Sequence, residues 1–278
     1  MLDEEAIWAM TILHISDGWE TTNGVAVAAR LIGGEQESEG HVVHFRRWAG
    51  IAALRSADEV WVHCAWRPCL WWASLFARRL VRMPHGSFDP VRLGHHGSRK
   101  RLVGLIERFF LRRAARIVVT CDAEREWVER HLGARRPPVE TVDVKRFFRL
   151  PSDASRVPRL ASLGRPVHLL YLGRRHPLKG VEILERAVQG MDGVELRIES
   201  GLVGRDKDSA WTWCDVLVLP TISENFGLVV AEALERGKRV VTTDGAPAWR
   251  GHPGVVFVEG FRDGTDEDRV RLLRDAIG

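Results

Sequence analysis

Short apolar runs alternate with amphipathic stretches along most of this chain. Apolar residues recur with a helical period between the runs, which is typical of β-α-β units and a parallel sheet. In the first half, the expected strands are 11–16, 41–45, 59–65, 82–85 and 116–121, and the expected helices are 24–32, 68–80, 99–114 and 123–133. In the second half, the expected strands are 167–173, 194–199, 215–220, 239–245 and 254–259, and the expected helices are 180–189, 227–237 and 266–277.

The alternation lapses between residues 146 and 166, in a segment rich in Pro, Ser and Arg. Such a segment is typical of a linker, so the chain is predicted to form two doubly wound, Rossmann-like α/β domains, 1–150 and 151–278. A closing helix is expected at about 265–277. Because open parallel sheets bind ligands beyond the carboxyl ends of their strands, the site is expected in a cleft between the two domains.

Composition narrows the class of protein only slightly. The chain has 278 residues, of which 45% are hydrophobic and 28% charged, and its net charge is +4. It contains no apolar run of membrane-spanning length, and its acidic start does not resemble a signal peptide, so a cytoplasmic protein is expected. Four cysteines without a C-x-x-C pair fit small buried side chains in a reducing compartment.

Two glutamates flank the start of a predicted helix in the segment "LPTISENFGLVVAEALERG". Glu224 precedes the helix, Gly227 lies at its mouth, and Glu232 lies inside it. Free N–H groups at a helix start favour an anion such as phosphate, and a carboxylate on each side would accept hydrogen bonds from hydroxyl groups. The arrangement suits a sugar, a diphosphate and a ribose, although a helix cap and a solvated glutamate explain the spacing equally well.

The segment "SENFGLVVAEAL" resembles the E-x7-E motif of retaining GT-B glycosyltransferases of family 4, of the bacterial polysaccharide and lipopolysaccharide type. Glu224 and Glu232 match its glutamates, with a phenylalanine-glycine-leucine core between them. "YLGRRHPLKG" resembles the segment of this family that supplies a basic pair to the donor diphosphate. The donor-binding residues that these two segments imply are Arg174, Lys179, Asn225, Phe226, Gly227, Leu228 and Glu232. The catalytic residues that they imply are Arg174, Lys179 and Glu224.

Two N-terminal segments extend the resemblance over nearly the whole chain. "MPHGSFDP" is similar to the segment that carries the active-site histidine of the family, which implies a catalytic role for His85, although a plain turn histidine before Gly86 is the alternative. "TTNGVAVAARL", which contains Asn23 and Gly24, is similar to the glycine loop that opens the first helix, and this implies a donor contact at Gly24.

The resemblance implies a metal-independent, retaining hexosyltransferase. Its donor would be a nucleotide sugar, UDP- or GDP-linked, and no other cofactor is implied. Its acceptor would be a glycan or a lipid-linked saccharide of cell-surface polysaccharide or lipopolysaccharide synthesis, on the inner face of the membrane. The stretch "GLVGRDKDSAWTWC" is shorter than the family's base-binding module, so a degenerate protein that only binds nucleotide sugars stays an alternative.

A basic segment, 98–116, offers a further surface. Arg101, Arg108 and Arg112 share one face of the expected helix, and Leu102, Leu105, Ile106 and Phe109 lie on another. Docking on an anionic membrane and simple solvation are equally good interpretations, and a polyanion binder is a weaker one. No helix-turn-helix, RNA-recognition or zinc module is present, so no nucleic-acid partner is expected.

Asp206 and Asp208 form a D-x-D triplet. In a different glycosyltransferase fold, a triplet of this kind holds a metal ion. Here it is expected to lie in a polar loop without further ligands, so no metal site is predicted. Eleven tryptophans are expected mostly in the core, with one or two able to stack on a sugar.

Overall fold

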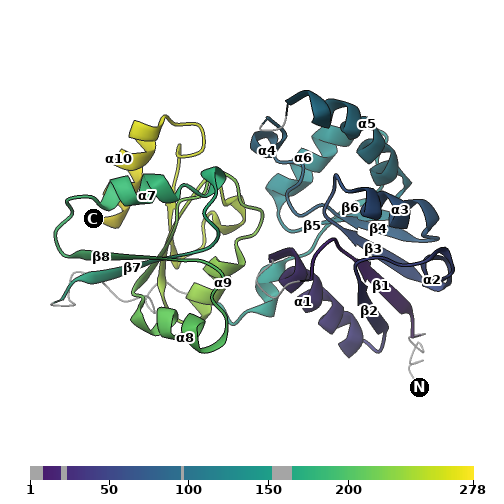
Figure 1. Ribbon diagram of the computed structural model, residues 1–278, viewed down its shortest axis with the longest axis horizontal. Coiled ribbons are helices and arrows are strands. Elements are labelled where there is room, and N and C mark those ends of the chain that lie inside the picture. The colour runs from purple at the N-terminus through teal and green to yellow at the C-terminus, as the bar shows by residue number, and fades with distance from the viewer. Residues whose placement is uncertain (1–8, 20–23, 95–96, 152–164) are drawn as a thin grey trace, which may run out of the picture. The chain divides into compact units, whose positions relative to one another are not determined.

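The computed structural model describes residues 9–19, 24–94, 97–151 and 165–278, although the side chains of 97–102 lie outside the described part. The chain divides into an N-terminal unit, 1–142, and a C-terminal unit, 143–278. Each unit contains one wholly parallel sheet with helices on both faces (Figure 1). The predicted pair of Rossmann-like domains is therefore confirmed.

The sheet of the N-terminal unit has the strand order β2-β1-β3-β4-β5-β6. Its strands are β1 (Thr11–Ile15), β2 (Val42–Arg46), β3 (Glu59–His63), β4 (Leu80–Met83), β5 (Arg116–Val119) and β6 (Val139–Thr141). Its helices are α1 (Gly24–Ser38), α2 (Ile51–Ser56), α3 (Pro68–Phe76), α4 (Pro90–Gly94), α5 (Gly97–Arg113) and α6 (Asp122–Leu132).

The sheet of the C-terminal unit has the strand order β11-β10-β9-β7-β8. Its strands are β7 (Val167–Leu172), β8 (Val194–Glu199), β9 (Val216–Leu219), β10 (Arg239–Thr243) and β11 (Val255–Val258). Its helices are α7 (Val181–Val188), α8 (Gly204–Trp213), α9 (Leu228–Glu235) and α10 (Asp266–Ile277), with short 3-10 turns η1 (Val144–Phe147), η4 (Pro177–Lys179) and η5 (Pro247–Trp249). Helices α7 and α10 cover one face of this sheet, and α8 and α9 cover the other (Figure 1).

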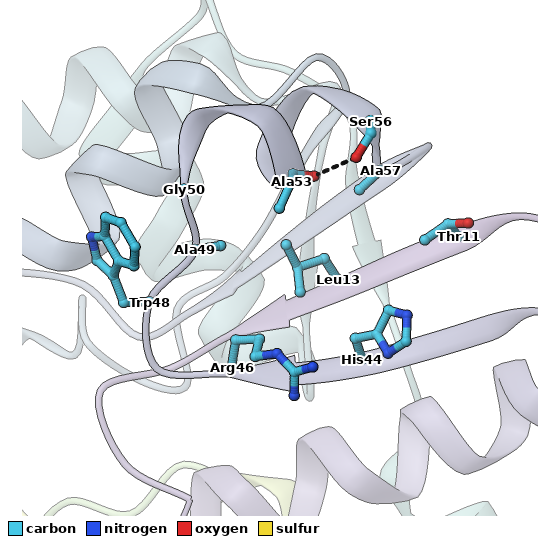
Figure 2. Close-up of a pocket in the computed structure, with 10 residues that line it drawn as sticks. All are labelled: Thr11, Leu13, His44, Arg46, Trp48, Ala49, Gly50, Ala53, Ser56 and Ala57. Atoms are coloured by element: carbon cyan, nitrogen blue, oxygen red, sulfur yellow. Dashed lines mark hydrogen bonds between the residues drawn. The ribbon is translucent and has the colours of Figure 1, made fainter.

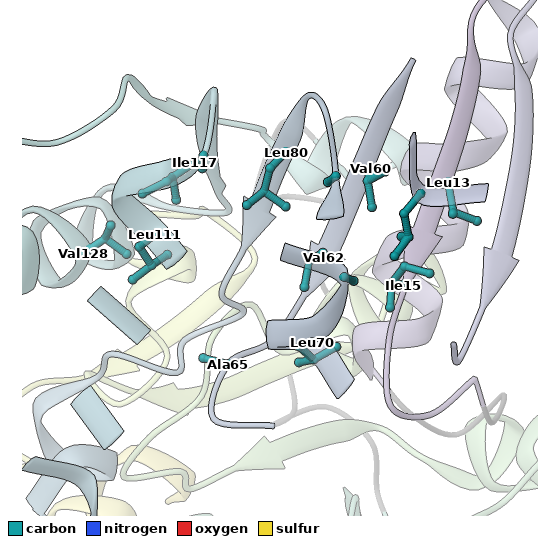
Figure 3. Packing of buried hydrophobic residues seen from close by; sticks show 14 of the residues in the cluster. Leu13, Ile15, Val60, Val62, Ala65, Leu70, Leu80, Leu111, Ile117 and Val128 are labelled. Carbon is teal, nitrogen blue, oxygen red and sulfur yellow. The ribbon is translucent and has the colours of Figure 1, made fainter. Parts of the chain in front are cut away.

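Alternation along the strands decides what each face of the N-terminal sheet contacts. Leu13, Ile15, Val60 and Val62 belong to one buried cluster with residues of α2, α3, α5 and α6 (Figure 3). Successive side chains of a strand point to opposite faces, so His14, Trp61 and His63 lie on the other face, toward α1. Gln36 of α1 contacts His14 there.

Several elements differ from those expected. The expected helix at 68–80 ends at Phe76, and Leu80 already belongs to β4. Helices α2, α4 and α8 and strand β6 were not predicted, because each is short or largely polar and carries little periodicity. Residues 152–164 of the expected linker, and Asn23 of the predicted glycine loop, lie outside the described residues.

The buried face of the basic helix α5 is not the face that carries most of its apolar residues. Its buried stripe is Gly104, Glu107, Phe110 and Leu111, whereas three apolar side chains point to solvent. These are Leu105, Ile106 and Phe109, which are 63%, 42% and 58% exposed. The orientation of the helix follows from a buried ion pair, because Glu107 must reach Arg82 of β4, and both side chains are fully buried.

Candidate functional site

The strand order places a topological switch point at the centre of the C-terminal sheet. Strands β7 and β9 are neighbours, and the chain leaves β7 toward β8 on one side but leaves β9 toward β10 on the other. The loops that follow β7 and β9 therefore diverge at the carboxyl edge, where open α/β sheets bind their ligands. These loops begin at residues 173 and 220 and lead into the two segments that resemble the glycosyltransferase motifs.

Close backbone contacts join these two loops. The carbonyl oxygen of Leu178 accepts hydrogen bonds from the Ile222 amide at 2.9 Å and from the Thr221 hydroxyl at 3.0 Å. A side chain at Gly180 would place its Cβ 2.1 Å from the Pro220 carbonyl oxygen, and Gly180 has a left-handed φ of 63°. Only glycine fits a position with both restrictions, so the sequence Lys-Gly is required for the two loops to meet.

The basic residues of the first loop have different surroundings. The Lys179 ammonium forms an ion pair with the Glu224 carboxylate of the second loop, and both side chains are largely buried. Arg174 is exposed, and its carbonyl oxygen accepts a hydrogen bond of 2.8 Å from the hydroxyl of the buried Tyr171. Its neighbour Arg175 pairs with Glu185 on the surface at 2.6 Å. The structure thus brings Lys179 and Glu224 together and leaves the Arg174 side chain facing solvent beside them.

Helix α9 begins at Leu228, one residue after Gly227, where the helix was expected to start. Gly227 is the N-cap with φ 71°, and Leu228 is the first helical residue, so free N–H groups of the first turn face the carboxyl edge. The preceding Phe226 packs on Trp249, with ring centroids 5.1 Å apart, and its carbonyl oxygen accepts the indole N–H. The amide oxygen of Asn225 is buried, and no described residue hydrogen-bonds it.

The second glutamate, Glu232, lies one helical turn beyond Leu228. Its carboxylate forms an ion pair of 2.7 Å with Lys207 of α8, and its side chain is 21% exposed. The predicted polar loop around the D-x-D triplet was therefore wrong. Asp206 and Asp208 lie on α8, which buries Ala210 and Trp211 and carries Lys207 toward Glu232. Among the described residues, no group of three or more His, Cys, Asp or Glu is placed to hold a metal ion.

The N-terminal unit has its own switch point, between β1 and β3. Gly24, the predicted donor contact, is the first residue of α1, which follows β1. His85 follows β4 in a tight turn, with φ 52° at His85 and φ 71° at Gly86. A non-glycine residue with positive φ is uncommon, and here Glu124 of α6 accepts the Gly86 amide at 2.5 Å and helps to hold the turn.

The imidazole of His85 belongs to a buried row of side chains. Its Nε2 lies 2.9 Å from Nδ1 of His63, and Nε2 of His63 lies 2.8 Å from Nδ1 of His14. Nε2 of His14 in turn lies 2.8 Å from Oε1 of Gln36 on α1. Desolvation lowers the pKa of His14 to about 4 and of His85 to about 3, and it lowers the pKa of His63 as well.

The sequence predicts a role for His85 but does not indicate the residues behind it. His14 and His63 each stand in an apolar strand run, and that is the signal that was available. A polar side chain that is fully buried in a strand needs a partner, and adjacent strands offer the nearest one. Gln36 and Lys207 carry no comparable signal, because polar residues on a helix are usually solvated.

A separate pocket of about 450 Å³ opens on the N-terminal unit, near the edge of its sheet (Figure 2). Its lining residues are Thr11 and Leu13 of β1, His44 and Arg46 of β2, and Trp48, Ala49, Gly50, Ala53, Ser56 and Ala57. None of the predicted site residues lies there. Trp48 is 61% exposed at its rim and stacks on Trp72, with ring centroids 6.4 Å apart.

Comparison with known families agrees with this architecture. Residues 14–145 match the family described as glycosyl transferase 4-like domain, and residues 154–275 match glycosyl transferases group 1. No curated protein sequence matches the chain significantly.

Solved structures share the fold at low identity. Sucrose-phosphate synthase from Thermosynechococcus elongatus has a TM-score of 0.69 and 15% identity, over 96% of this chain and 90% of that one. HepE from Anabaena, in complex with UDP and glucose, has a TM-score of 0.65 and 17% identity, over 96% and 90%. WaaG, involved in lipopolysaccharide biosynthesis, has a TM-score of 0.62 and 13% identity, over 96% and 90%. The two matched domains, in the order and fold described above, make this chain a glycosyltransferase of the GT-B type.

Proposed function

We propose that this glycosyltransferase moves a hexose-type sugar from a nucleotide sugar to a saccharide or lipid-linked acceptor, with retention of configuration, in cell-surface polysaccharide or lipopolysaccharide synthesis. One observation carries the proposal. Lys179, Glu224 and the start of α9 meet at the switch point of the C-terminal sheet, with Arg174 on the same loop as Lys179 and Glu232 one turn into the helix. Cations, free N–H groups and carboxylates in this order suit a diphosphate between a sugar and a ribose.

The chemistry of the transfer requires positive charge at the leaving group. Cleavage of the bond between the anomeric carbon and the diphosphate builds negative charge on the phosphate while the sugar becomes oxocarbenium-like. Fixed cations and helix N–H groups stabilise that state more than the ground state. Lys179 supplies a point charge, Arg174 a planar fork of donors, and α9 its first-turn N–H groups. These groups supply the charge without a metal ion, and a phosphate near Lys179 would compete with Glu224 for the ammonium.

The two glutamates are assigned different parts of the donor, and a binding measurement separates them. Glu232→Ala should weaken nucleotide and nucleotide-sugar binding alike, by roughly 10-fold or more, because a charged acceptor of the ribose hydroxyls is lost. Glu224→Ala should spare free nucleotide and lower turnover, because it contacts the transferred sugar. Titration calorimetry with nucleotide and nucleotide sugar measures both effects.

Glu235→Ala is the matched control, since Glu235 lies on the same helix, is exposed, and accepts a hydrogen bond of 3.3 Å from the Arg149 amide. It should bind nucleotide like the wild type. Equal nucleotide affinity in Glu232→Ala and the wild type would contradict the ribose assignment.

The donor base is tested by a thermal-shift panel of UDP-, GDP- and ADP-sugars. The HepE structures contain UDP, glucose and UDP-glucose, and a starch synthase IV structure contains ADP, so uridine and adenine nucleotides both belong in the panel. A donor that raises the melting temperature and is consumed with an acceptor supports a transferase. Binding without consumption supports instead the degenerate, nucleotide-sugar-binding protein.

The acceptor side of the proposal includes an anionic membrane surface. Leu105, Ile106 and Phe109 are exposed on α5, beside Arg108 and Arg112, which gives this helix both apolar and basic groups at the surface. The side chain of Arg101 lies outside the described part. Three arginines of this segment have partners: Arg112 donates to the Leu132 carbonyl at 2.8 Å, Arg113 donates to the Ser74 carbonyl at 3.1 Å, and Arg116 pairs with Glu59 at 2.9 Å. In the described part of the chain, no helix is long and apolar enough to cross a membrane.

Membrane docking predicts that vesicles containing phosphatidylglycerol pellet the protein at low salt. Salt should release it, since ions screen surface charges beyond about 8–10 Å near physiological ionic strength. Leu105→Ser/Phe109→Ser should abolish pelleting without unfolding, because both side chains are exposed. Val203→Ser, an exposed apolar residue of the C-terminal unit, is the control and should pellet like the wild type. Pelleting of the double variant at the wild-type level would show that α5 is only a solvated face.

A further inference from the structure

Each orientation of the Gln36 amide gives the buried row behind His85 one consistent set of proton positions, and the structure places Oε1 toward His14. With Gln36 Oε1 toward His14, the Nε2 of His14 must carry a proton and donate it, so Nδ1 of His14 is an acceptor. His63 must then donate from Nε2 and accept at Nδ1, and His85 must donate from Nε2. Each neutral imidazole has one donor and one acceptor nitrogen, so Nδ1 of His85 is left as an acceptor.

We infer that Gln36, His14 and His63 are positioning residues that lock His85 as a neutral imidazole with the proton on Nε2, so that Nδ1 accepts a hydrogen bond from a substrate hydroxyl. The inference rests on the proposed function for the identity of that substrate as a sugar donor or acceptor. It does not require His85 to remove the proton. A hydroxyl that donates to a fixed acceptor is oriented, with one lone pair free for attack or for a further contact.

The position of the row on the sheet supports this role. β1, β3 and β4 are adjacent strands, so His14, His63 and His85 step across three neighbours toward the carboxyl edge. His14 and His63 are fully buried, and His85 keeps 7% exposure at the outer end. No described residue hydrogen-bonds Nδ1 of His85. The left-handed backbone at His85 costs free energy, and it is held by the His63 contact and by Glu124.

The charged groups that the described part of the chain places around the row are themselves paired. Glu59, whose charge acts on His14, is engaged by Arg79 and Arg116. Arg82, whose charge disfavours a cation at His63, is engaged by Glu107. Glu124 accepts the amides of Gly86 and Thr120, and Asp89 accepts the Val91 amide at 2.9 Å. Aromatic rings also contact the row: Phe45 and Trp61 pack against His14, and Trp19 packs against His63.

The tautomer is measured directly by long-range proton–nitrogen correlation spectra of the full chain labelled with nitrogen-15 histidine. The His85 signals, assigned by their loss in His85→Asn, should show the proton on Nε2 and should not titrate between pH 8 and 5. Gln36→Leu removes the acceptor that sets the row, so His85 should become a mixture of tautomers. Gln36→Glu keeps an acceptor, so it should restore the Nε2 proton, and its charge should move the row's titration upward in pH.

Activity gives the second readout. His63→Phe, which keeps the ring shape but breaks the row, should lower kcat/KM by about 10-fold, as expected for one lost orienting hydrogen bond. In Gln36→Glu, kcat/KM should fall as the pH is lowered from 7 to 5, because His85 becomes protonated. In the wild type, His85 should stay neutral over this range and cause no such fall. His131→Phe, a histidine outside the row, should leave the pH profile unchanged.

Two results would overturn the inference: a wild-type His85 with its proton on Nδ1 or with an ordinary titration near pH 6.5, or a Gln36→Leu variant whose His85 tautomer is unchanged. If Gln36→Glu is an active transferase with the same pH profile as the wild type, the inference is rejected and the proposed function still stands. Absence of transfer with every donor would reject the proposed function, and the spectra would still decide the state of the row.

Discussion

Replacing Lys179 with alanine is expected to lower kcat/KM by about 10² or more, and Arg174→Ala is expected to do the same. Loss of one fixed donor to the charge that develops in a transition state costs roughly 3 kcal/mol. Lys179 lies where this loss would matter, at the junction of the two loops of the switch point, with Glu224 as its partner. Steady-state kinetics with the donor identified by the thermal-shift panel measures the effect.

Arg175→Ala is the matched control for this pair, because Arg175 is the next residue, carries the same charge, and is paired with Glu185 at the surface. It should retain kcat/KM within about two-fold, as expected for an exposed ion pair. Chelators should leave the activity of the wild type unchanged. A strict requirement for a divalent ion would contradict the proposed mechanism and would return attention to Asp206 and Asp208 on α8.

Glu107→Ala is expected to destabilise the N-terminal unit by about 3–5 kcal/mol, since it leaves a buried arginine without its carboxylate. Arg82 donates to Glu107, to the Ser74 hydroxyl at 2.7 Å and to the Cys64 carbonyl at 3.0 Å. Glu107 also accepts the Trp71 indole N–H at 2.6 Å. Urea unfolding followed by tryptophan fluorescence should show an earlier midpoint for the transition of this unit.

A second variant separates charge from packing. Arg82→Met/Glu107→Leu removes both charges and should be more stable than Glu107→Ala alone, because no uncompensated ion remains buried. Glu126→Ala on α6 removes an exposed partner of Arg130 and should leave the midpoint unchanged. A Glu107→Ala variant that unfolds at the wild-type midpoint would show that water reaches Arg82.

The fold was largely predictable because its information is local and periodic. Ten expected strands and all seven expected helices correspond to observed elements, since apolar runs and helical periods are direct consequences of burial in a parallel sheet. Elements such as α8 and β6 escaped prediction because a short polar segment becomes helix or strand through its neighbours. The meeting of Lys179 with Glu224 also follows from sequence, because both come just after adjacent parallel strands.

Side-chain pairing was not predictable in the same way. The apolar pattern of α5 indicates one buried face, but the partner for Glu107 stands on a strand 25 positions away, so the helix turns its glutamate inward and leaves Phe109 exposed. The row from Gln36 to His85 likewise depends on the register of three strands and the position of α1. The Lys207 contact with Glu232 depends on a helix that periodicity does not indicate.

Tyr171 is the single tyrosine of the chain, and its hydroxyl reaches the Arg174 carbonyl oxygen directly beneath the first loop of the switch point. Biosynthetic incorporation of fluorotyrosine would therefore introduce one fluorine nucleus, next to the residues assigned to the diphosphate and nowhere else. Its resonance would report the state of that loop without any mutation or chemical tag. Nucleotide occupancy, loop exchange and the effect of each substitution would then be read from one line in a one-dimensional spectrum of the intact protein.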